Sequence, residues 1–138
     1  MKKLVVIMIM ALVCIAAGAR KKSDATQRQA AVEFASTVYD FGNIREDAGK
    51  VTHEFVYTST GQAPLAVLWA KAQCGCTKPK YSTSPLSPGK RGKISVTFIP
   101  KGYSGEFVKT VTVRTNAPGD QKKITLTIKG FVIPSNPQ

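Results

Sequence analysis

The feature that most constrains this chain is an alternation of apolar and polar residues with a period of two. Side chains on a β-strand point alternately to opposite faces, so this pattern predicts strands with one buried face. It recurs in residues 51–58, 93–100, 107–115 and 123–132. No segment after the N-terminal apolar run shows a sustained helical period. The alternation therefore predicts a fold built from β-strands alone.

Two further segments extend this prediction. Residues 32–42 are typical of a split first strand that Gly42 closes, and residues 65–72 are apolar on both faces. A strand that is apolar on both faces is expected at the centre of a sheet, with Trp69 in the core. Turn signals rich in Gly and Pro separate the segments about every eight to twelve residues. We therefore expect an all-β, immunoglobulin-like β-sandwich of about seven antiparallel strands.

The N-terminus has the pattern of a secretory signal peptide in residues 1–19. Lys2 and Lys3 precede an apolar run, residues 4–17, and Ala17-Gly18-Ala19 fits a cleavage site with small residues. The run has 14 residues, whereas a helix that spans a bilayer needs about 20. We therefore expect a cleaved signal peptide, no transmembrane segment in the mature chain, and a periplasmic or cell-surface location.

Cys14 raises an alternative in which its thiol is acylated and anchors the protein to a membrane. Val13 disfavours this alternative, because lipoprotein signals carry a small residue before the modified cysteine. Residues 20–31 are polar and unpatterned and are expected to form a flexible lead. The immunoglobulin-like β-sandwich domain is then expected to span residues 32–133.

Basic residues outnumber acidic ones, 20 to 8, and they are unevenly placed. Between Glu54 and Glu106 there is no acidic residue, and the basic ones are Lys71, Lys78, Lys80, Lys90, Arg91, Lys93 and Lys101. One interpretation is a solvated surface that aids solubility. The other is a patch on the loop 77–93 for a protein or an anionic envelope component, formed by Lys78, Lys80, Lys90, Arg91 and Lys93. Nucleic acid is a poor candidate, because no aromatic residues alternate with these cations as stacking partners.

Cys74 and Cys76 are the cysteines that remain after removal of the signal peptide. In an extended strand their α-carbons would lie about 6.5–7 Å apart, the long limit for a disulfide, and Gly75 allows the backbone to close that gap. Four interpretations stay open: small packed residues, reduced or bridged to each other; a redox pair that exchanges disulfides; a metal site; or bonds between chains. Lys71 and Lys78 favour a reactive thiolate, but the pattern lacks the helix N-terminus that commonly activates one.

A metal site at these cysteines lacks ligands, because two thiolates are too few and His53 is the only histidine. His53 shares a strand face with Phe55, which predicts a partly buried, hydrogen-bonded side chain rather than a ligand. No Ser-His-Asp arrangement and no glycine-rich phosphate loop is present. We therefore expect no metal, no other cofactor and no enzymatic activity.

Several short motifs follow one another in a fixed order between residues 38 and 132. They are Tyr39-Asp40-Phe41-Gly42, His53-x-Phe55-x-Tyr57, Gly61-x-x-Pro64-Leu65, Cys74-Gly75-Cys76-Thr77, Pro85-Leu86-x-Pro88-Gly89, Gly105-x-Phe107-x-Lys109 and Ile128-x-Gly130. This series resembles the secreted bacterial family named domain of unknown function 1573. Ser59 stands where that family usually has Asn, and its hydroxyl can still cap a turn. The resemblance implies an immunoglobulin-like sandwich in an exported protein, and it implies no activity.

Together these features favour an exported, non-enzymatic, immunoglobulin-like module that binds a partner in the cell envelope. An exposed sheet edge would allow the partner to add a strand. The alternative is a thiol–disulfide exchange or metal-handling protein that uses Cys74 and Cys76. The oligomeric state has no signature in the sequence.

Overall fold

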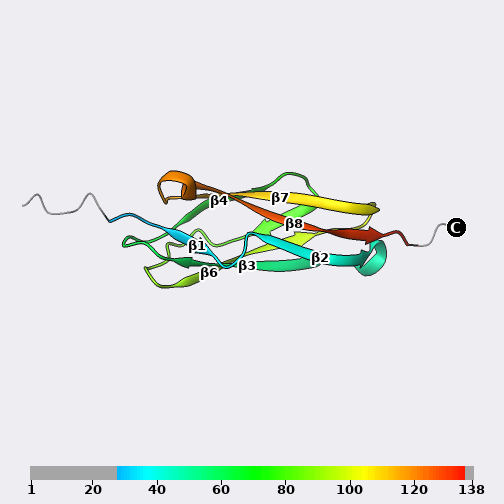
Figure 1. Ribbon diagram of the computed structural model, residues 1–138, viewed down its shortest axis with the longest axis horizontal. Helices are drawn as coiled ribbons and strands as arrows, with labels where there is room; N and C mark the ends of the chain where they lie inside the picture. Colours follow the sequence, from blue (N-terminus) through cyan, green and yellow to red (C-terminus); the bar gives the residue numbers. More distant parts are fainter. Residues whose placement is uncertain (1–27, 136–138) are drawn as a thin grey trace, which may run out of the picture.

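The computed structural model describes residues 28–135, which form two packed β-sheets (Figure 1). The strands are β1 (Val32–Phe34), β2 (Val38–Arg45), β3 (Val51–Ser59), β4 (Val67–Ala72), β5 (Thr77–Lys80), β6 (Arg91–Phe98), β7 (Gly105–Thr115) and β8 (Lys123–Ile133). Two short 3-10 helices, η1 (Glu46–Ala48) and η2 (Gly119–Lys122), connect β2 to β3 and β7 to β8. One sheet has the strand order β1-β3-β6-β5, and we call it the β3–β6 sheet. The other has the order β2-β8-β7-β4, and we call it the β7–β8 sheet.

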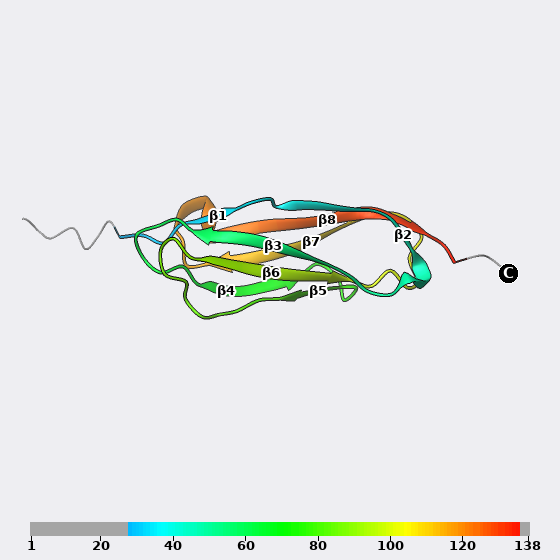
Figure 2. The same cartoon turned by 90° about the horizontal axis from the view of Figure 1, so that it is seen from below.

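The prediction of an all-β, immunoglobulin-like sandwich is confirmed, with two corrections. Within residues 28–135 there are eight strands rather than seven, and β2 runs parallel to β8, although an antiparallel sandwich is expected from the sequence. The additional strand is β5, which lies where a loop is expected. The parallel pair arises where the first strand splits, because β1 pairs with β3 and β2 joins the other sheet. Figure 2 shows β1 and β2 in line along one side of the sandwich. Since β2 keeps the direction of β1, it meets β8 in a parallel pair.

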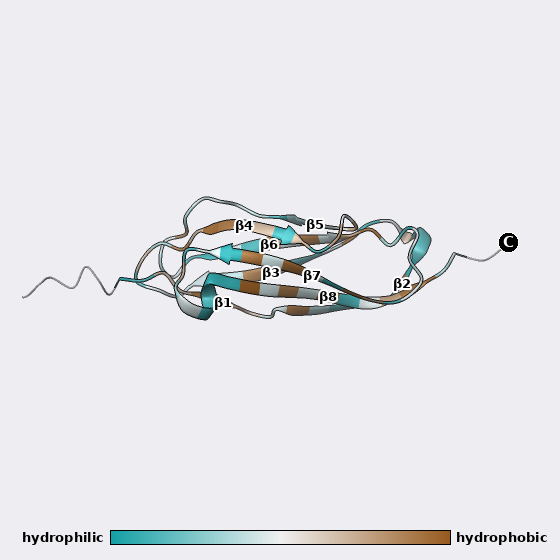
Figure 3. Ribbon diagram, turned by 90° about the horizontal axis from the view of Figure 1, so that it is seen from above, coloured by the Kyte–Doolittle hydropathy of each residue, from teal (hydrophilic) through white to brown (hydrophobic). Residues whose placement is uncertain are grey.

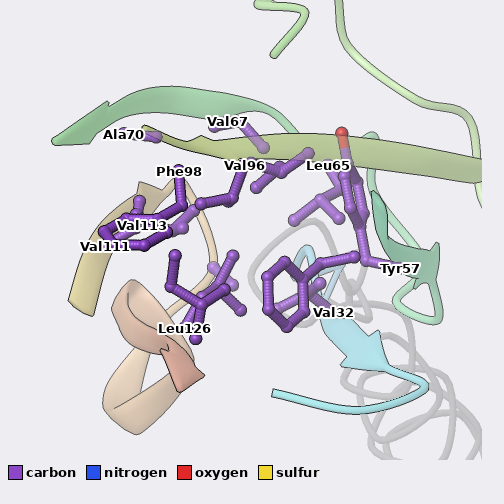
Figure 4. Close-up of a cluster of buried hydrophobic side chains, with 14 of the residues drawn as sticks. Val32, Tyr57, Leu65, Val67, Ala70, Val96, Phe98, Val111, Val113 and Leu126 are labelled. Carbon is purple, nitrogen blue, oxygen red and sulfur yellow. The ribbon is translucent and has the colours of Figure 1, made fainter. Parts of the chain in front are cut away.

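The core lies between the two sheets and is built from the apolar positions of the alternating strands (Figure 4). Along the strands, residues of high and low hydropathy alternate (Figure 3). The largest fully buried side chains are Phe55, Phe98, Leu65, Ile94, Leu126 and Ile128. The buried faces expected for the four alternating segments are therefore confirmed, because side chains two apart share a face.

Strand β4 is an edge strand of the β7–β8 sheet, not the central strand that its apolar sequence predicts. A bulge between Val67 and Trp69 interrupts its pairing with β7, and Leu68 is 51% exposed. Trp69 is half-buried rather than part of the core, and the Lys71 ammonium lies 5.2 Å from the centre of its ring. An apolar run cannot distinguish a covered strand from a bulged edge, because the bulge changes which face each residue occupies.

The loop expected over residues 77–93 begins with a strand instead. Thr77–Lys80 is strand β5, which pairs antiparallel with β6 and forms one edge of the β3–β6 sheet. Pro79 lies within β5 and is tolerated there, because an edge strand can leave one position without a ladder hydrogen bond. The proline and the length of four residues make this strand resemble a loop in the sequence.

The first strand does not end at Gly42. Strand β2 continues to Arg45 through an irregularity between Asp40 and Asn43, where Gly42 has a φ of 67°. The Asp40 carboxylate accepts a hydrogen bond of 2.8 Å from the Gly42 amide. Glycine adopts this positive φ without steric cost, so Gly42 bends the strand rather than closing it.

Part of the expected flexible lead packs against the domain. The Gln29 carbonyl accepts a hydrogen bond of 2.9 Å from the Gln62 amide, and Ala30 is buried. The lead's other residues, 20–27, and the expected signal peptide, residues 1–19 with Cys14, lie outside the described residues. Among residues 28–135, no helix has the length and apolar character needed to cross a bilayer.

Candidate functional site

Four of the five cations predicted to form a patch lie on the outer face of the β3–β6 sheet. Ile94, Val96 and Phe98 of β6 are buried, so Arg91 and Lys93 point to the opposite, outer face. Pairing with β6 places Lys78 of β5 opposite Thr97 and Lys80 opposite Ser95, on that same face. We call these four exposed side chains, Lys78, Lys80, Arg91 and Lys93, the basic face. The fifth cation, Lys90, is exposed in the loop immediately before β6.

Two acidic residues share the outer face of this sheet: Glu54, and Glu33 of β1, which is opposite Thr58, the residue that pairs with Arg91. Glu54 of β3 is opposite Ser95, and its carboxylate accepts a hydrogen bond of 2.6 Å from the Lys93 ammonium. Both side chains are half or more exposed, so this ion pair adds little to stability. Between residues 28 and 135, the other ion pair joins Arg45 to Asp47, on a different part of the fold. The remaining cations of the basic face therefore keep their charge uncompensated by an ion pair in this part of the chain.

A depression of about 390 Å³ lies on this side of the molecule. It is lined by Glu54, Lys80, Tyr81, Ser82, Lys93 and Ser95. The Lys80 ammonium, the Tyr81 phenol and the hydroxyls of Ser82 and Ser95 can donate hydrogen bonds to a carboxylate or phosphate. The second ammonium group, that of Lys93, is paired with the Glu54 carboxylate in the same depression. Glu54, Tyr81 and Ser82 have no signal in the sequence that joins them to this site, because their proximity to the lysines depends on the register between β3, β6 and β5.

The two cysteines form a disulfide with each other at the turn that leads from β4 to β5. Their α-carbons are 5.4 Å apart, closer than an extended strand would place them, because the chain turns at Gly75. This turn carries the chain from the edge of one sheet to the edge of the other. Both cysteines are half-buried, and Cys76 packs against the core. Thr77, the next residue, is buried, with its hydroxyl 3.6 Å from the Cys76 sulfur.

The hypothesis of a metal site finds no ligand cluster in the described part of the chain. Residues 28–135 contain no group of three or more His, Cys, Asp or Glu side chains placed to hold one ion. The cysteine sulfurs are bonded to each other, so neither is a thiolate ligand in this structure.

His53 is an aromatic packing residue on the inner side of β3. Its ring stacks on Tyr39 of β2, with 3.6 Å between centroids and 7° between planes. It meets Phe55 edge to face at 4.7 Å. His53 is partly buried, as expected. Within residues 28–135 its side chain makes aromatic contacts and not the hydrogen bond that was also expected.

Acid is expected to destabilise the fold through His53. Burial lowers the pKa of His53 from its ordinary value of 6.5, and nearby Glu54 only partly opposes this shift. The unfolded chain therefore takes up the proton more readily. The free energy of unfolding should be highest above about pH 6.5 and should fall as the pH drops through the folded-state pKa.

Urea denaturation at about pH 7.5 and 5.5 measures this effect. His53→Phe is the matched control, because phenylalanine keeps an aromatic ring and cannot titrate. The expected result is a larger loss of stability at the lower pH in the natural protein than in the variant. Equal losses would show that His53 does not contribute.

Residues 32–132 match the model of a family described as "Protein of unknown function (DUF1573)". The chain belongs to this family. The resemblance inferred from the motifs is thus confirmed over nearly the whole β-sandwich of this DUF1573 protein. No curated protein matches the chain.

Several solved structures are similar in fold to this DUF1573 protein. A protein of unknown function from Porphyromonas gingivalis W83 aligns with a TM-score of 0.67 and 15% identity, over 80% of this chain and 51% of that one. PapD-like domain 7 of human CEP192 aligns with a TM-score of 0.58 and 12% identity, over 88% of this chain and 97% of that domain. The VesB protease of Vibrio cholerae aligns with a TM-score of 0.58 and 16% identity, over 77% of this chain and 32% of the protease. At these identities the likeness concerns the fold alone, and the chain spans about half the length of the P. gingivalis protein.

Proposed function

We propose that this DUF1573 protein is a non-enzymatic binding module of the cell envelope and that the basic face is its binding surface. The observation that carries the proposal is the pairing of β5 with β6. This pairing gathers Lys78, Lys80, Arg91 and Lys93 from two separate segments onto one exposed sheet face. A surface that only aids solubility can carry its cations scattered over the molecule. A surface that binds an extended anionic partner needs them together on one face.

The chemistry of this face favours an anionic protein segment or polymer. Its cations stand on paired strands, so the backbone does not have to be ordered when a partner binds and only side-chain entropy is lost. Val56 is 39% exposed and lies opposite Lys93, which adds an apolar contact beside the charges. Electrostatic attraction across such a face accelerates association and weakens with salt, because counter-ions screen exposed charges.

Export to the envelope is the second part of this proposal. Residues 1–19 have the pattern of a signal peptide, with acylation at Cys14 as the alternative. The Cys74–Cys76 disulfide supports an oxidising location, such as the periplasm or the cell surface, because the cytosol keeps most thiols reduced. Cell fractionation that recovers the chain from the cytosol would remove this part of the proposal.

Charge reversal of three residues of the basic face and of the adjoining Lys90 is expected to abolish binding. The test variant combines Lys78→Glu, Lys80→Glu, Lys90→Glu and Arg91→Glu. We expect its affinity for immobilised polyglutamate to fall at least about tenfold at low salt, and its recovery of proteins from envelope extracts to be lost.

The matched control changes the same number of exposed cations elsewhere. It combines Lys50→Glu, Lys101→Glu, Lys122→Glu and Lys123→Glu, all of which lie off the basic face. Both variants have the same net charge, so only the position of the charges differs. Equal binding by the two variants would contradict the proposed surface, whether both bind or both fail.

A further inference from the structure

The hydroxyl of Thr77 points at the two sulfurs of the disulfide. Thr77 is 2% exposed, and its Oγ1 lies 3.6 Å from the Cys76 Sγ and 3.9 Å from the Cys74 Sγ. In residues 28–135 this hydroxyl has no other hydrogen-bond partner. Thr115, a second buried threonine, instead donates to the Gln121 carbonyl at 2.7 Å. Thr77 is thus buried without the oxygen acceptor that satisfies Thr115.

The strength of this contact depends on the redox state of the sulfurs. A disulfide sulfur is a weak hydrogen-bond acceptor, whereas a thiolate is charged and accepts a strong, charge-assisted bond. Reduction of the Cys74–Cys76 bond would therefore replace the weak sulfur acceptors of the buried Thr77 hydroxyl with a strong, charged one. The local structure favours a thiolate at this place more than an ordinary turn would.

The position of the disulfide argues against a mainly structural role. It closes a loop between residues only two apart, so it removes little conformational entropy from the unfolded chain. The half-buried pair lies at the end of the sandwich between the edge strands β4 and β5. Cys76 packs against the core, whereas Cys74 does not, so we assign the Cys74 sulfur as the one that a substrate attacks.

We propose that Cys74-Gly75-Cys76-Thr77 is a thiol–disulfide exchange site for dithiols. A substrate thiolate attacks the Cys74 Sγ, and a mixed disulfide forms as the Cys74–Cys76 bond breaks. The electron pair of that bond passes to the Cys76 Sγ, which becomes a thiolate and accepts a hydrogen bond from the Thr77 hydroxyl.

The second substrate thiol completes the exchange. It loses its proton to solvent and attacks the substrate sulfur of the mixed disulfide, which releases Cys74 as a thiolate. The released thiolates take up protons from solvent according to their pKa values. The substrate dithiol has then lost two electrons and become a disulfide, and the Cys74–Cys76 disulfide has gained those electrons.

Single-turnover reduction of the oxidised full chain by dithiothreitol tests this proposal. Acid quenching, alkylation and intact mass give the rate at which the disulfide opens, and ultraviolet absorbance of thiolate gives the thiol pKa of the reduced protein. Thr77→Val removes the hydroxyl and keeps the side-chain shape, while Thr77→Ser keeps the hydroxyl. We expect Thr77→Val to slow reduction about tenfold and to raise the thiol pKa, and Thr77→Ser to leave both nearly unchanged.

Two outcomes would overturn the proposal. One is a thiol pKa and a reduction rate that are the same in Thr77→Val and the natural protein, because a packing role for Thr77 moves only the melting temperature. The other is a disulfide that resists dithiothreitol until denaturant unfolds the domain, since an exchange site must react in the folded state. Neither outcome depends on the basic face, so this test is independent of the proposed binding function.

Discussion

Replacing Phe98 with alanine is expected to lower the free energy of unfolding by about 3–5 kcal/mol. Phe98 is fully buried, and its ring stacks on Phe107 of the other sheet with 4.1 Å between centroids and 13° between planes. Tyr103 contacts the same ring, with centroids 5.5 Å apart. The cavity left by the ring would lie between two paired sheets that cannot collapse independently. The loss is a large part of the roughly 5–15 kcal/mol that stabilises a typical domain.

Urea denaturation measures this loss. Val108→Ala is the control, because Val108 is 60% exposed on β7 and its truncation should change the stability by less than about 0.5 kcal/mol. Phe98→Leu keeps part of the buried volume and should fall between the two. Similar stabilities for the Phe98→Ala and Val108→Ala variants would show that the two sheets do not pack through Phe98.

Gly92→Ala is expected to destabilise the domain by about 1–3 kcal/mol through overpacking. A methyl group at this position would lie 2.5 Å from Cζ of Tyr57 and 2.8 Å from Cδ1 of Leu86. The Tyr57 ring is 3% exposed and has little room to move. Leu86 is held by paired backbone hydrogen bonds with Leu65, so the added methyl group also pushes on the loop that leads to β6.

Thermal unfolding checks this prediction, since 1 kcal/mol shifts the melting temperature of a domain of this size by about 4–8 °C. Gly75→Ala is the matched control. A methyl group on Gly75 would meet no atom within 4 Å, and Gly75 does not have a positive φ. An equal shift for both substitutions would mean that the contact among Gly92, Tyr57 and Leu86 does not limit the packing.

The prediction of fold class succeeded because burial on one face of a strand leaves a local trace in the sequence. Phe55 and Tyr57, or Ile94 and Val96, are two residues apart and share a face wherever the strand lies. The prediction failed for β4 and β5 because strand order leaves no such trace. Leu68 is as apolar as a core residue and yet is half exposed at an edge.

The candidate sites divide in the same way. Lys78, Lys80, Arg91 and Lys93 are a charge run in the sequence, but only the register of β5 against β6 places them on one face. The redox hypothesis for Cys74 and Cys76 arose from their spacing. Only the structure shows that the Thr77 hydroxyl contacts the two sulfurs. Whether a threonine points to solvent or to sulfur depends on which side of β5 is buried.

The sequence by itself determined the all-β class and the faces that form the core, and it pointed to the cations and the cysteine pair of the candidate sites. These properties depend on side-chain chemistry and on a period of two, which act over a few neighbouring residues. Tertiary structure alone decided that the first strand changes sheets, that β4 and β5 are edges and that Thr77 faces the sulfurs. Those outcomes depend on hydrogen bonds between strands far apart in the chain, and a strand's own residues do not encode which partner will satisfy its backbone.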